Sequence, residues 1–370
     1  MKFKSVTVHP RLSDRNFVRY FDRYTLAEQS PKFSDYRQGK RHLFITSKKG
    51  GLFHICASLD PRYICCSTHV ISHISNCPFE CTYCFLQNYL TDTTLTVVAD
   101  TDAIVEEIFH KTSLQPWRLF RIGTWELGDS LAIEPLNQFA IDLVSRFKSL
   151  DNCLLKLRTK GSAVEPLLDV EHGGKTVISW TVNPPEVIKR EEIGTASLEK
   201  RIQAMEKVAR AGYPIGLHFD PMIVFNGWET AYEDLVDAIF SVIEPENVIW
   251  ISIGSLRFNP EMKKKIENNY PASKITAQEM VLGDDNKFRY PRPLREEMYS
   301  LLLSFLKAAG AEQCFVYLCM ERWNVWERVF GRCPRSIGHL DYLMAKTVHE
   351  RFPNSAPQSP PKDLYMALTY

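Results

Sequence analysis

The run Ser75-Asn-Cys-Pro-Phe-Glu-Cys-Thr-Tyr-Cys-Phe-Leu-Gln87 carries more information than any other part of this chain. Cys77, Cys81 and Cys84 are spaced Cys-x3-Cys-x2-Cys, with Tyr83 directly before the last cysteine. Three thiolates on one short loop can bind three irons of a [4Fe–4S] cluster. The fourth iron then lacks a protein ligand, and an open position on a metal centre is where a small molecule can bind and react. The spacing therefore predicts a cluster with one reactive iron.

A zinc site is the first alternative, and inert buried thiols are the second. Zinc is often bound by three cysteines and one histidine, and His73 is close enough in sequence to be the fourth ligand. Zinc-binding cysteines usually come as two separated pairs, and the sequence has no second Cys-x2-Cys pair. We therefore favour the iron–sulfur cluster.

The composition is typical of a globular enzyme in a reducing compartment. The chain has 370 residues, 45% hydrophobic and 24% charged, and its ten cysteines form no disulfide-type pattern. A net charge of +1 argues against nonspecific nucleic-acid binding by the whole surface but allows a local basic groove. The sequence has neither a long apolar run nor an N-terminal signal core. We expect a cytoplasmic protein without a membrane segment; the oligomeric state is not predicted.

Strands and helices alternate along the middle of the chain. The patterns predict strands at 63–74, 117–122, 153–158, 176–182, 215–219 and 248–253, and helices at 103–111, 135–150, 164–168, 197–212 and 230–243. Such alternation is typical of βαβ units around a parallel sheet. The predicted fold class is α/β, a partial (β/α)6 TIM-type barrel in which the chemistry lies at the carboxyl ends of the strands.

Three regions are expected. Residues 1–65 form an N-terminal extension, 66–320 the barrel with the cluster loop at 77–84, and 321–370 a C-terminal extension. The tail from Pro353 is rich in proline and polar residues, which predicts an extended or mobile segment.

The cysteine motif resembles the signature of radical S-adenosylmethionine (SAM) enzymes, and further blocks resemble the spore photoproduct lyase family. These blocks lie at 75–87, 179–183, 191–201, 211–216, 227–232 and 256–260. The resemblance implies a partial barrel, a [4Fe–4S] cluster, and SAM bound to the fourth iron. It also implies cleavage of SAM to a 5′-deoxyadenosyl radical that abstracts hydrogen, with a flavodoxin or ferredoxin as electron donor. The family's named member repairs a thymine–thymine adduct in DNA.

Two residues depart from the family pattern. Glu126 aligns with the hydrogen-donating cysteine of the lyase, and Phe85 replaces a tyrosine that follows the third cluster cysteine. A carboxylate does not readily supply a hydrogen atom, and phenylalanine has no O–H. The alternatives are therefore a radical SAM enzyme of the same family acting on a small molecule, nucleotide or protein, and a metal-stabilised binding protein without catalysis.

The resemblance also implies a set of residues around SAM. These are Tyr83, Glu126, Ser130, Lys160, Thr181 and Asn183, of which Tyr83 and Glu126 are also expected to be catalytic. A carboxylate at Glu126 suits the ammonium group of SAM. Thr181 and Asn183 stand two apart on one strand and so face the same side.

Four residues are candidates for substrate contact. His218 and Asp220 share one face of the fifth strand, where the lyase has apolar residues; they could handle a proton, or simply bond to each other. Arg289 and Tyr290 lie in a basic and aromatic stretch that aligns with the lyase's DNA-wedging hairpin, and a solvated loop is the alternative.

The remaining cysteines give no sign of a second cluster. Cys314, Cys319 and Cys333 are unevenly spaced, and Cys314 and Cys319 stand in an apolar stretch where buried thiols are expected. Cys65 and Cys66 are also predicted to be core residues.

Overall fold

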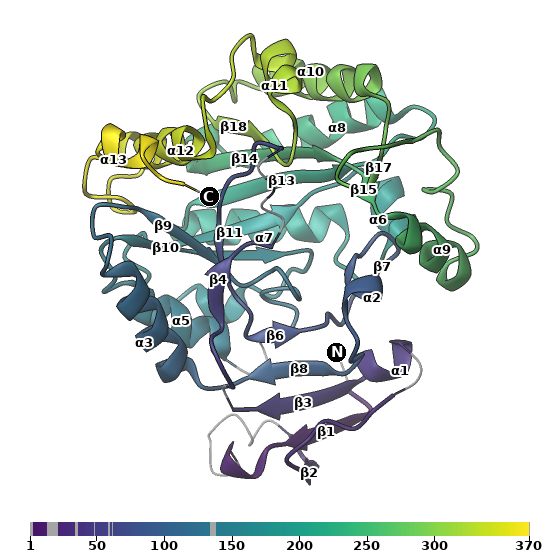
Figure 1. Ribbon diagram of the computed structural model, residues 1–370, viewed down its shortest axis with the longest axis vertical. Coiled ribbons are helices and arrows are strands. Elements are labelled where there is room, and N and C mark those ends of the chain that lie inside the picture. The colour runs from purple at the N-terminus through teal and green to yellow at the C-terminus, as the bar shows by residue number, and fades with distance from the viewer. Residues whose placement is uncertain are drawn as a thin grey trace.

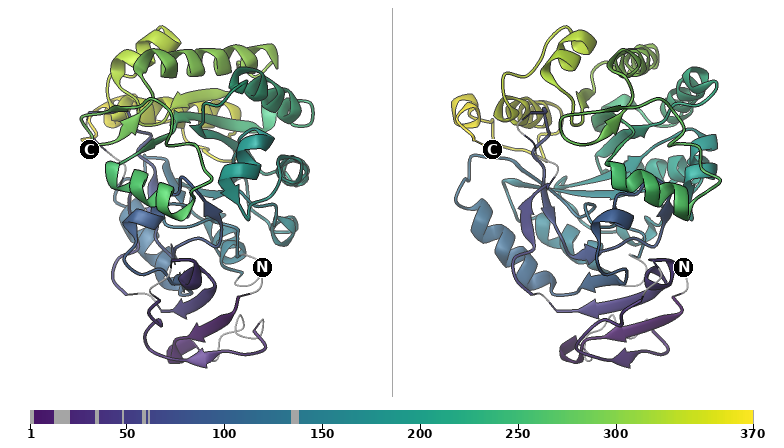
Figure 2. Two further views of the ribbon diagram at one scale, coloured as in Figure 1. Left: turned by 90° about the vertical axis from the view of Figure 1, so that its right-hand side faces the viewer. Right: turned by 45° about the vertical axis from the view of Figure 1, so that its right-hand side comes forward.

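The computed structural model describes residues 3–12, 21–33, 36–47, 49–57, 60, 62–133 and 138–369. Its main feature is an eight-stranded sheet in the order β18-β14-β13-β11-β10-β9-β5-β4. The strands are β4 (Phe53–Ile55), β5 (His69–Ile71), β9 (Phe120–Gly123), β10 (Cys153–Thr159), β11 (Thr176–Thr181), β13 (Ile215–Met222), β14 (Val248–Ser255) and β18 (Phe315–Leu318). Neighbours are parallel except β4 and β5. The sheet curls with helices outside it, so the predicted α/β partial barrel is confirmed (Figures 1 and 2).

The sheet differs from the prediction in two places. Strand β18 joins β14 in parallel and was missed, so the barrel has one parallel strand more than the six that were expected. The predicted strand at 63–74 is divided: β5 belongs to the barrel, whereas β6 (Ile74–Ser75) pairs with β8 in a second sheet.

The second, five-stranded sheet lies at the lower end of Figure 1, in the order β2-β1-β3-β8-β6. Its strands are β1 (Ser5–Val8), β2 (Thr25–Leu26), β3 (His42–Thr46), β8 (Leu95–Val98) and β6. Since β6 and β8 follow residue 66, this sheet combines the expected N-terminal extension with part of the barrel region. It has its own small apolar core, which includes Val8, Leu43 and Leu95.

Helices follow most of the barrel strands. They are α1 (Tyr36–Lys40), α2 (Leu86–Tyr89), α3 (Thr101–Thr112), α5 (Phe139–Phe147), α6 (Pro185–Glu191), α7 (Leu198–Arg210), α8 (Trp228–Phe240), α9 (Pro260–Asn269), α10 (Arg292–Ala308), α11 (Trp323–Phe330), α12 (Ile337–Arg351) and α13 (Lys362–Met366). Short 3₁₀ turns occupy Pro10–Leu12, Glu165–Leu167 and Pro245–Asn247. The helix predicted at 135–150 is α5, and residues 134–137 lie outside the described residues. None of the helices among these residues is long and apolar enough to cross a membrane.

Local sequence accounts for these elements. Strand β14 reads Val-Ile-Trp-Ile-Ser-Ile-Gly-Ser and is buried at every position, as expected of a parallel strand covered on both faces. Helix α7 begins at Ser197, whose hydroxyl accepts a hydrogen bond from the Lys200 N–H at 3.4 Å and caps the first turn.

Two further pairings matter for the site. Strands β7 (Glu80–Cys81) and β12 (Glu192–Ile193) pair antiparallel and join the cluster loop to the segment after β11. Strands β15 (Arg257–Phe258), β16 (Val281–Leu282) and β17 (Phe288–Arg289) form a small antiparallel sheet in the order β15-β17-β16.

The C-terminal tail, predicted to be extended or mobile, contains a short helix. Helix α13 packs against α12 near the tail's end. Tyr365 is fully buried, and its hydroxyl accepts a hydrogen bond from the Leu119 N–H at 2.8 Å. The polar, proline-rich composition of the tail did not indicate that the Tyr365 side chain is buried against the barrel.

Candidate active site

A cavity of about 640 Å³ opens at the carboxyl ends of the barrel strands. Its wall combines the cluster loop, the ends of β10, β11, β13, β14 and β18, and the turn after β9. Barrel enzymes place their chemistry at this end of the sheet. The cavity is therefore the candidate active site.

The cluster loop is held from both sides. Asn76 has a left-handed backbone (φ 75°), and its side chain accepts from the Cys77 N–H at 2.8 Å and donates to the Thr93 carbonyl at 2.6 Å. Asparagine tolerates this conformation better than most residues. On the far side, the Thr82 N–H donates to the Glu191 carbonyl at 2.8 Å. The loop is thus fixed before any metal is considered.

All three motif cysteines line the cavity. Burial raises the pKa of the Cys77 thiol and raises that of Cys81 to about 12, and the neighbouring thiols add to both shifts. Crowded thiols of this kind become thiolates when a metal centre compensates their charge. The donor set of Cys77, Cys81 and Cys84 therefore fits a cluster that binds through thiolates.

His73, the fourth ligand that a zinc site would need, has other partners. Its ring stacks on Phe139 with centroids 3.9 Å apart, and its Nδ1 lies 3.5 Å from the Ile71 carbonyl. In the described part of the chain, no three His, Cys, Asp or Glu side chains are grouped to hold one metal ion. This does not test the cluster, in which each thiolate binds a different iron.

A buried carboxylate links two of the predicted SAM residues. The Tyr83 hydroxyl and the Asn183 amide, the latter at 2.9 Å, both donate to Glu192 Oε1. Arg201 donates to Glu192 Oε2 at 2.6 Å, and this ion pair is fully buried. Burial opposes ionisation of Glu192, but Arg201 and Lys160 hold its pKa below the usual value. Sequence reasoning missed Glu192 and Arg201, although both stand in a block that was compared with the family.

Only Tyr83 of this network lines the cavity; Asn183 lies behind it. The Tyr232 hydroxyl donates to Asn183 Oδ1 at 3.0 Å, so the amide is engaged on both sides. In this structure Asn183 orients Glu192, and through it Tyr83, and does not face the cavity directly.

Lys160 lines the cavity, with its Nζ 5.6 Å from the centre of the Tyr83 ring. Asp129, also on the wall, accepts from the Lys160 N–H at 2.8 Å and from the Thr159 hydroxyl at 2.7 Å. Ser130 is buried and accepts from the Arg158 N–H at 2.9 Å. Ser130 therefore braces β10 from behind, and Asp129 is the wall residue that sequence reasoning passed over.

Glu126 lines the cavity but already has partners. Its Oε2 lies 3.0 Å from His54 Nε2, and its Oε1 accepts from the Ala57 N–H at 2.8 Å. The carboxylate thus ties the turn after β9 to the segment after β4 while it borders the cavity.

The predicted pair on β13 does not interact as a pair. Asp220 binds Arg257 at 3.1 Å, and its carbonyl accepts from Arg158 at 2.9 Å. His218 is buried on the cavity wall, and neither of its ring nitrogens has a partner among the described residues. Thr181, also on the wall, accepts from Arg158 Nε at 3.0 Å. The alternative of a buried His–Asp hydrogen bond is therefore wrong.

Three thiols that were expected in the core also border the cavity; of these, Cys65 is buried as predicted. Cys65, Cys66 and Cys319 line it, as does Cys56. Cys319 follows β18, the strand missed from the sequence, so its place at the open end of the barrel could not be recognised. Cys314, at the other end of that strand, is buried away from the cavity wall.

Arg289 and Tyr290 are not placed to meet nucleic acid, which corrects the prediction. Arg289 is 3% exposed, binds Asp285 at 2.5 Å, and donates to the Met320 carbonyl at 3.2 Å. Tyr290 is 0% exposed, and its hydroxyl accepts from the Val224 N–H at 3.1 Å. A basic and aromatic pattern looks the same whether its side chains point outward or inward.

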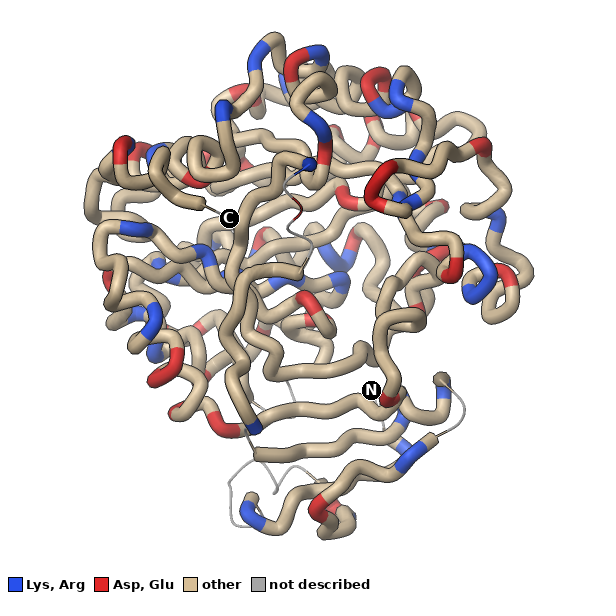
Figure 3. Tube along the Cα trace, in the orientation of Figure 1, with Lys and Arg blue, Asp and Glu red and all other residues tan. Residues whose placement is uncertain are grey.

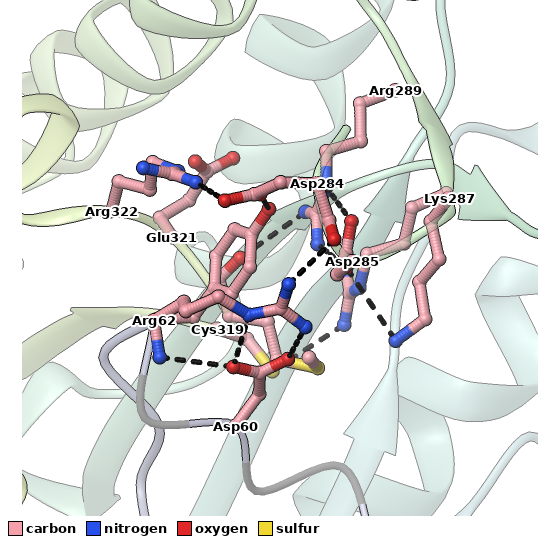
Figure 4. Close-up of polar contacts among 12 residues, drawn as sticks. Asp60, Arg62, Asp284, Asp285, Lys287, Arg289, Cys319, Glu321 and Arg322 are labelled. Carbon is pink, nitrogen blue, oxygen red and sulfur yellow. Dashed lines mark hydrogen bonds and ion pairs between the residues drawn. The ribbon is translucent and has the colours of Figure 1, made fainter. Parts of the chain in front are cut away.

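The hairpin turn between β16 and β17 is anchored to the linker before β5, as Figure 4 shows around Asp284. Arg62 donates to the Asp284 carbonyl at 2.5 Å and to Asp60 Oδ2 at 2.7 Å. Arg322 forms an ion pair with the Asp284 carboxylate. Val281 and Leu282 on β16 remain 50% and 54% exposed.

The sequence model of the spore photoproduct lyase family matches residues 23–292. This chain belongs to that family. It is 30% identical over 226 residues to the spore photoproduct lyase of Bacillus subtilis (strain 168), a match that covers 60% of this chain and 64% of the relative. The lyase of Geobacillus sp. (strain Y412MC61) is 28% identical over 214 residues, covering 57% and 63%. The chain thus spans less than two thirds of the length of these curated relatives.

Solved structures of spore photoproduct lyase share the fold. A double mutant with bound AdoMet and dinucleoside spore photoproduct superposes with a TM-score of 0.76 at 22% identity, covering 85% of this chain and 98% of that one. A lyase complexed with dinucleoside spore photoproduct gives 0.75 at 22% identity and the same coverage. The partial barrel of this family member is therefore that of the lyases.

Proposed function

We propose that this chain is a radical SAM enzyme that repairs the spore photoproduct, or a closely related lesion, in DNA. The observation that carries the proposal is the group of Cys77, Cys81 and Cys84, which face one cavity at the carboxyl end of a lyase-type barrel. When bound there, a [4Fe–4S] cluster with SAM supplies the electron and the 5′-deoxyadenosyl radical that abstracts hydrogen from the substrate.

The chain's own residues hold and orient the reactants. Lys160 places a cation beside the cluster loop, where it would meet the carboxylate of SAM, and Glu126 would meet the ammonium. The hydrogen bond from Tyr83 to Glu192 fixes the Tyr83 side chain in the cavity wall that also includes Lys160 and Glu126. Thr181 borders the cavity and would contact SAM directly. Ser130 and Asn183 do not border the cavity and would act indirectly, by holding β10 and Glu192 in place.

In this proposal the product radical receives its hydrogen atom from Cys319, a thiol that the resemblance to the family did not indicate. Cys319 lines the cavity, and burial together with the Asp220 carboxylate raises its pKa, so the sulfur stays protonated. A carbon radical can take the hydrogen atom of that S–H, which leaves a thiyl radical on Cys319. The missing cysteine at Glu126 therefore does not exclude lyase chemistry.

DNA would be contacted through the β16–β17 hairpin, by Val281 and Leu282 in place of Arg289 and Tyr290. Two exposed apolar side chains can act as a wedge where a base pair opens. In the view of Figure 3, acidic and basic residues are interspersed along α9 and α10, so binding would depend on local contacts and not on one broad basic face. A lesion in duplex DNA must leave the stack to reach the cavity.

The electron would come from a flavodoxin or ferredoxin, and the place of action would be the cytoplasm. Free cysteines throughout the described residues are compatible with a reducing compartment.

The test is an anaerobic assay of reconstituted protein with SAM, dithionite and a thymine dinucleotide spore photoproduct. Chromatography follows 5′-deoxyadenosine and restored thymine, with Cys84→Ala as the inactive control. Formation of both products is expected. If neither forms in a preparation that contains the cluster, the proposal is wrong.

A second candidate keeps the radical chemistry and changes the substrate to a small molecule, nucleotide or protein. Glu126, Phe85 and the polar His218 and Asp220 favour it, because the lyase differs at all four positions. Formation of 5′-deoxyadenosine without restored thymine would select this candidate.

A further inference from the structure

The inner wall of the barrel carries a row of polar side chains. Strand register places Thr181 beside His218, His218 beside Ser252, and Ser252 beside Tyr317, across β11, β13, β14 and β18. All four line the cavity. Barrels of this type are usually filled by branched apolar residues. A buried polar row therefore calls for a polar occupant.

His218 is the clearest sign of that occupant. Its side chain is 2% exposed, it faces the cavity, and neither ring nitrogen has a partner among the described residues. Buried polar groups in native proteins are nearly always hydrogen-bonded, to protein, water or ligand. The imidazole offers one N–H donor and one acceptor to whatever occupies the space in front of it.

Two cations stand beside this row, on β10. Lys156 and Arg158 are two residues apart and share the inner face of the strand. The Lys156 ammonium lies 4.5 Å from the centre of the Trp125 ring and 5.5 Å from that of Trp250, so its near neighbours are aromatic faces. Arg158 donates to neutral oxygens, the Thr181 hydroxyl and a backbone carbonyl.

The acidic groups on the cavity wall are engaged by other partners. Glu126 contacts His54 and the Ala57 N–H, and Asp129 accepts from Thr159 and the Lys160 N–H. Asp220 pairs with Arg257. Asp341, on helix α12, pairs with both Arg118 and Arg121.

Among the described residues, the cavity lining carries five Lys or Arg side chains against three Asp or Glu, so positive charge is in surplus, and Lys156 is only 3% exposed. Charges interact more strongly at such buried positions than in bulk water.

We propose that Lys156, Arg158 and His218 form a subsite for a phosphate group that the substrate carries into the barrel. Donors from two strands, β10 and β13, line the same cavity. Charge-assisted hydrogen bonds from such donors bind phosphate oxygens well. The identification of the ligand as a substrate rests on the proposed function, whereas the phosphate subsite itself does not. Two sources share this chemistry: the terminal phosphate of a nucleotide and an internal phosphodiester of DNA.

Proton linkage gives a test that does not depend on catalysis. The pKa of Lys156 is lowered to about 7, mainly by burial; Arg158 and Arg121 contribute to the lowering, whereas the thiols of Cys66 and Cys319 oppose it. A bound anion favours the ammonium form and raises this pKa. Phosphate binding at pH 8 should therefore take up protons, and affinity should weaken as the pH rises above 7.

The experiment is calorimetric titration of cluster-loaded protein, without SAM or reductant, with inorganic phosphate, thymidine 5′-phosphate and the dinucleotide TpT. Measurements at pH 7 and pH 8 in buffers of different ionisation enthalpy report proton uptake. Saturable binding is expected, at least about tenfold weaker in Lys156→Met and in His218→Leu. Lys189→Met, on the exposed side of α6, is the matched control and should bind like the unaltered protein.

The probes separate the two sources. Binding of thymidine 5′-phosphate but not TpT assigns a terminal phosphate, and binding of TpT assigns a phosphodiester. The absence of saturable binding of any probe would overturn the proposal, as would unchanged affinity in folded Lys156→Met and His218→Leu proteins. Reduction of the protein with SAM alone tests the radical chemistry separately, because 5′-deoxyadenosine can form without substrate. Its formation does not depend on whether phosphate binds.

Discussion

Tyr83 donates a hydrogen bond from its hydroxyl to the carboxylate of Glu192, 109 residues later in the chain. The same carboxylate is paired with Arg201 in a fully buried ion pair. The cluster loop and the end of β11 therefore share one charged anchor. If that anchor is weakened, both should loosen together.

Glu192→Gln should lower the free energy of unfolding by about 3 kcal/mol, because it leaves the Arg201 charge buried without its carboxylate. Chemical denaturation of the metal-free protein measures this. Glu186→Gln, which breaks the exposed Glu186–Arg190 pair on α6, is the matched control and should change stability by less than about 0.5 kcal/mol. Equal effects of the two changes would contradict the role assigned to Glu192.

Cys84→Ala should abolish cluster binding, since a cluster held by two thiolates on this loop lacks a ligand it needs. The expected result is loss of iron, of broad visible absorbance and of SAM cleavage after anaerobic reconstitution. Cys333→Ala, which removes an exposed thiol, should retain all three. Full iron content in Cys84→Ala would mean that the loop is not the cluster site.

Cys319→Ala should separate SAM cleavage from repair. Formation of 5′-deoxyadenosine should continue, whereas restored thymine should fall sharply, because the product radical has lost its hydrogen donor. Cys314→Ala, a buried thiol outside the cavity, serves as control. Unchanged repair by Cys319→Ala would move the donor role to Cys66 or Cys56, which also line the cavity.

Glu126→Gln should weaken SAM binding by about ten- to 150-fold, the loss expected for one charge-assisted hydrogen bond worth about 1.5–3 kcal/mol. The amide oxygen can still accept from the Ala57 N–H, so the fold around the turn should persist. Equilibrium binding of SAM to cluster-loaded protein measures the effect. If affinity is unchanged while the melting temperature falls, Glu126 is an anchor for the linker and not a SAM ligand.

Most of the barrel, and the position of Cys77, Cys81 and Cys84 together at its open end, could be predicted from the sequence, because cysteine spacing and the alternation of apolar segments are local signals. The placement of Cys319 could not be, since it depends on recognising β18, a four-residue strand that adds to the sheet at its edge. Glu192 and Arg201 were equally hidden, because a buried ion pair and a surface pair have the same residue types. Arg289 and Tyr290 were wrongly predicted to be exposed, because their residue types do not reveal that both side chains are buried.

The antiparallel pairing of β7 with β12 has a consequence for how the protein is assembled. The cysteines emerge early in synthesis, but the strand that pairs with their loop follows more than one hundred residues later, as the 109-residue separation of Thr82 and Glu191 shows. Contacts of such long range form late, because the intervening chain must be ordered first. Until β12 exists, only the Asn76 side of the loop has its partner. A cluster bound by these thiols would therefore be delivered to a barrel that is already largely folded.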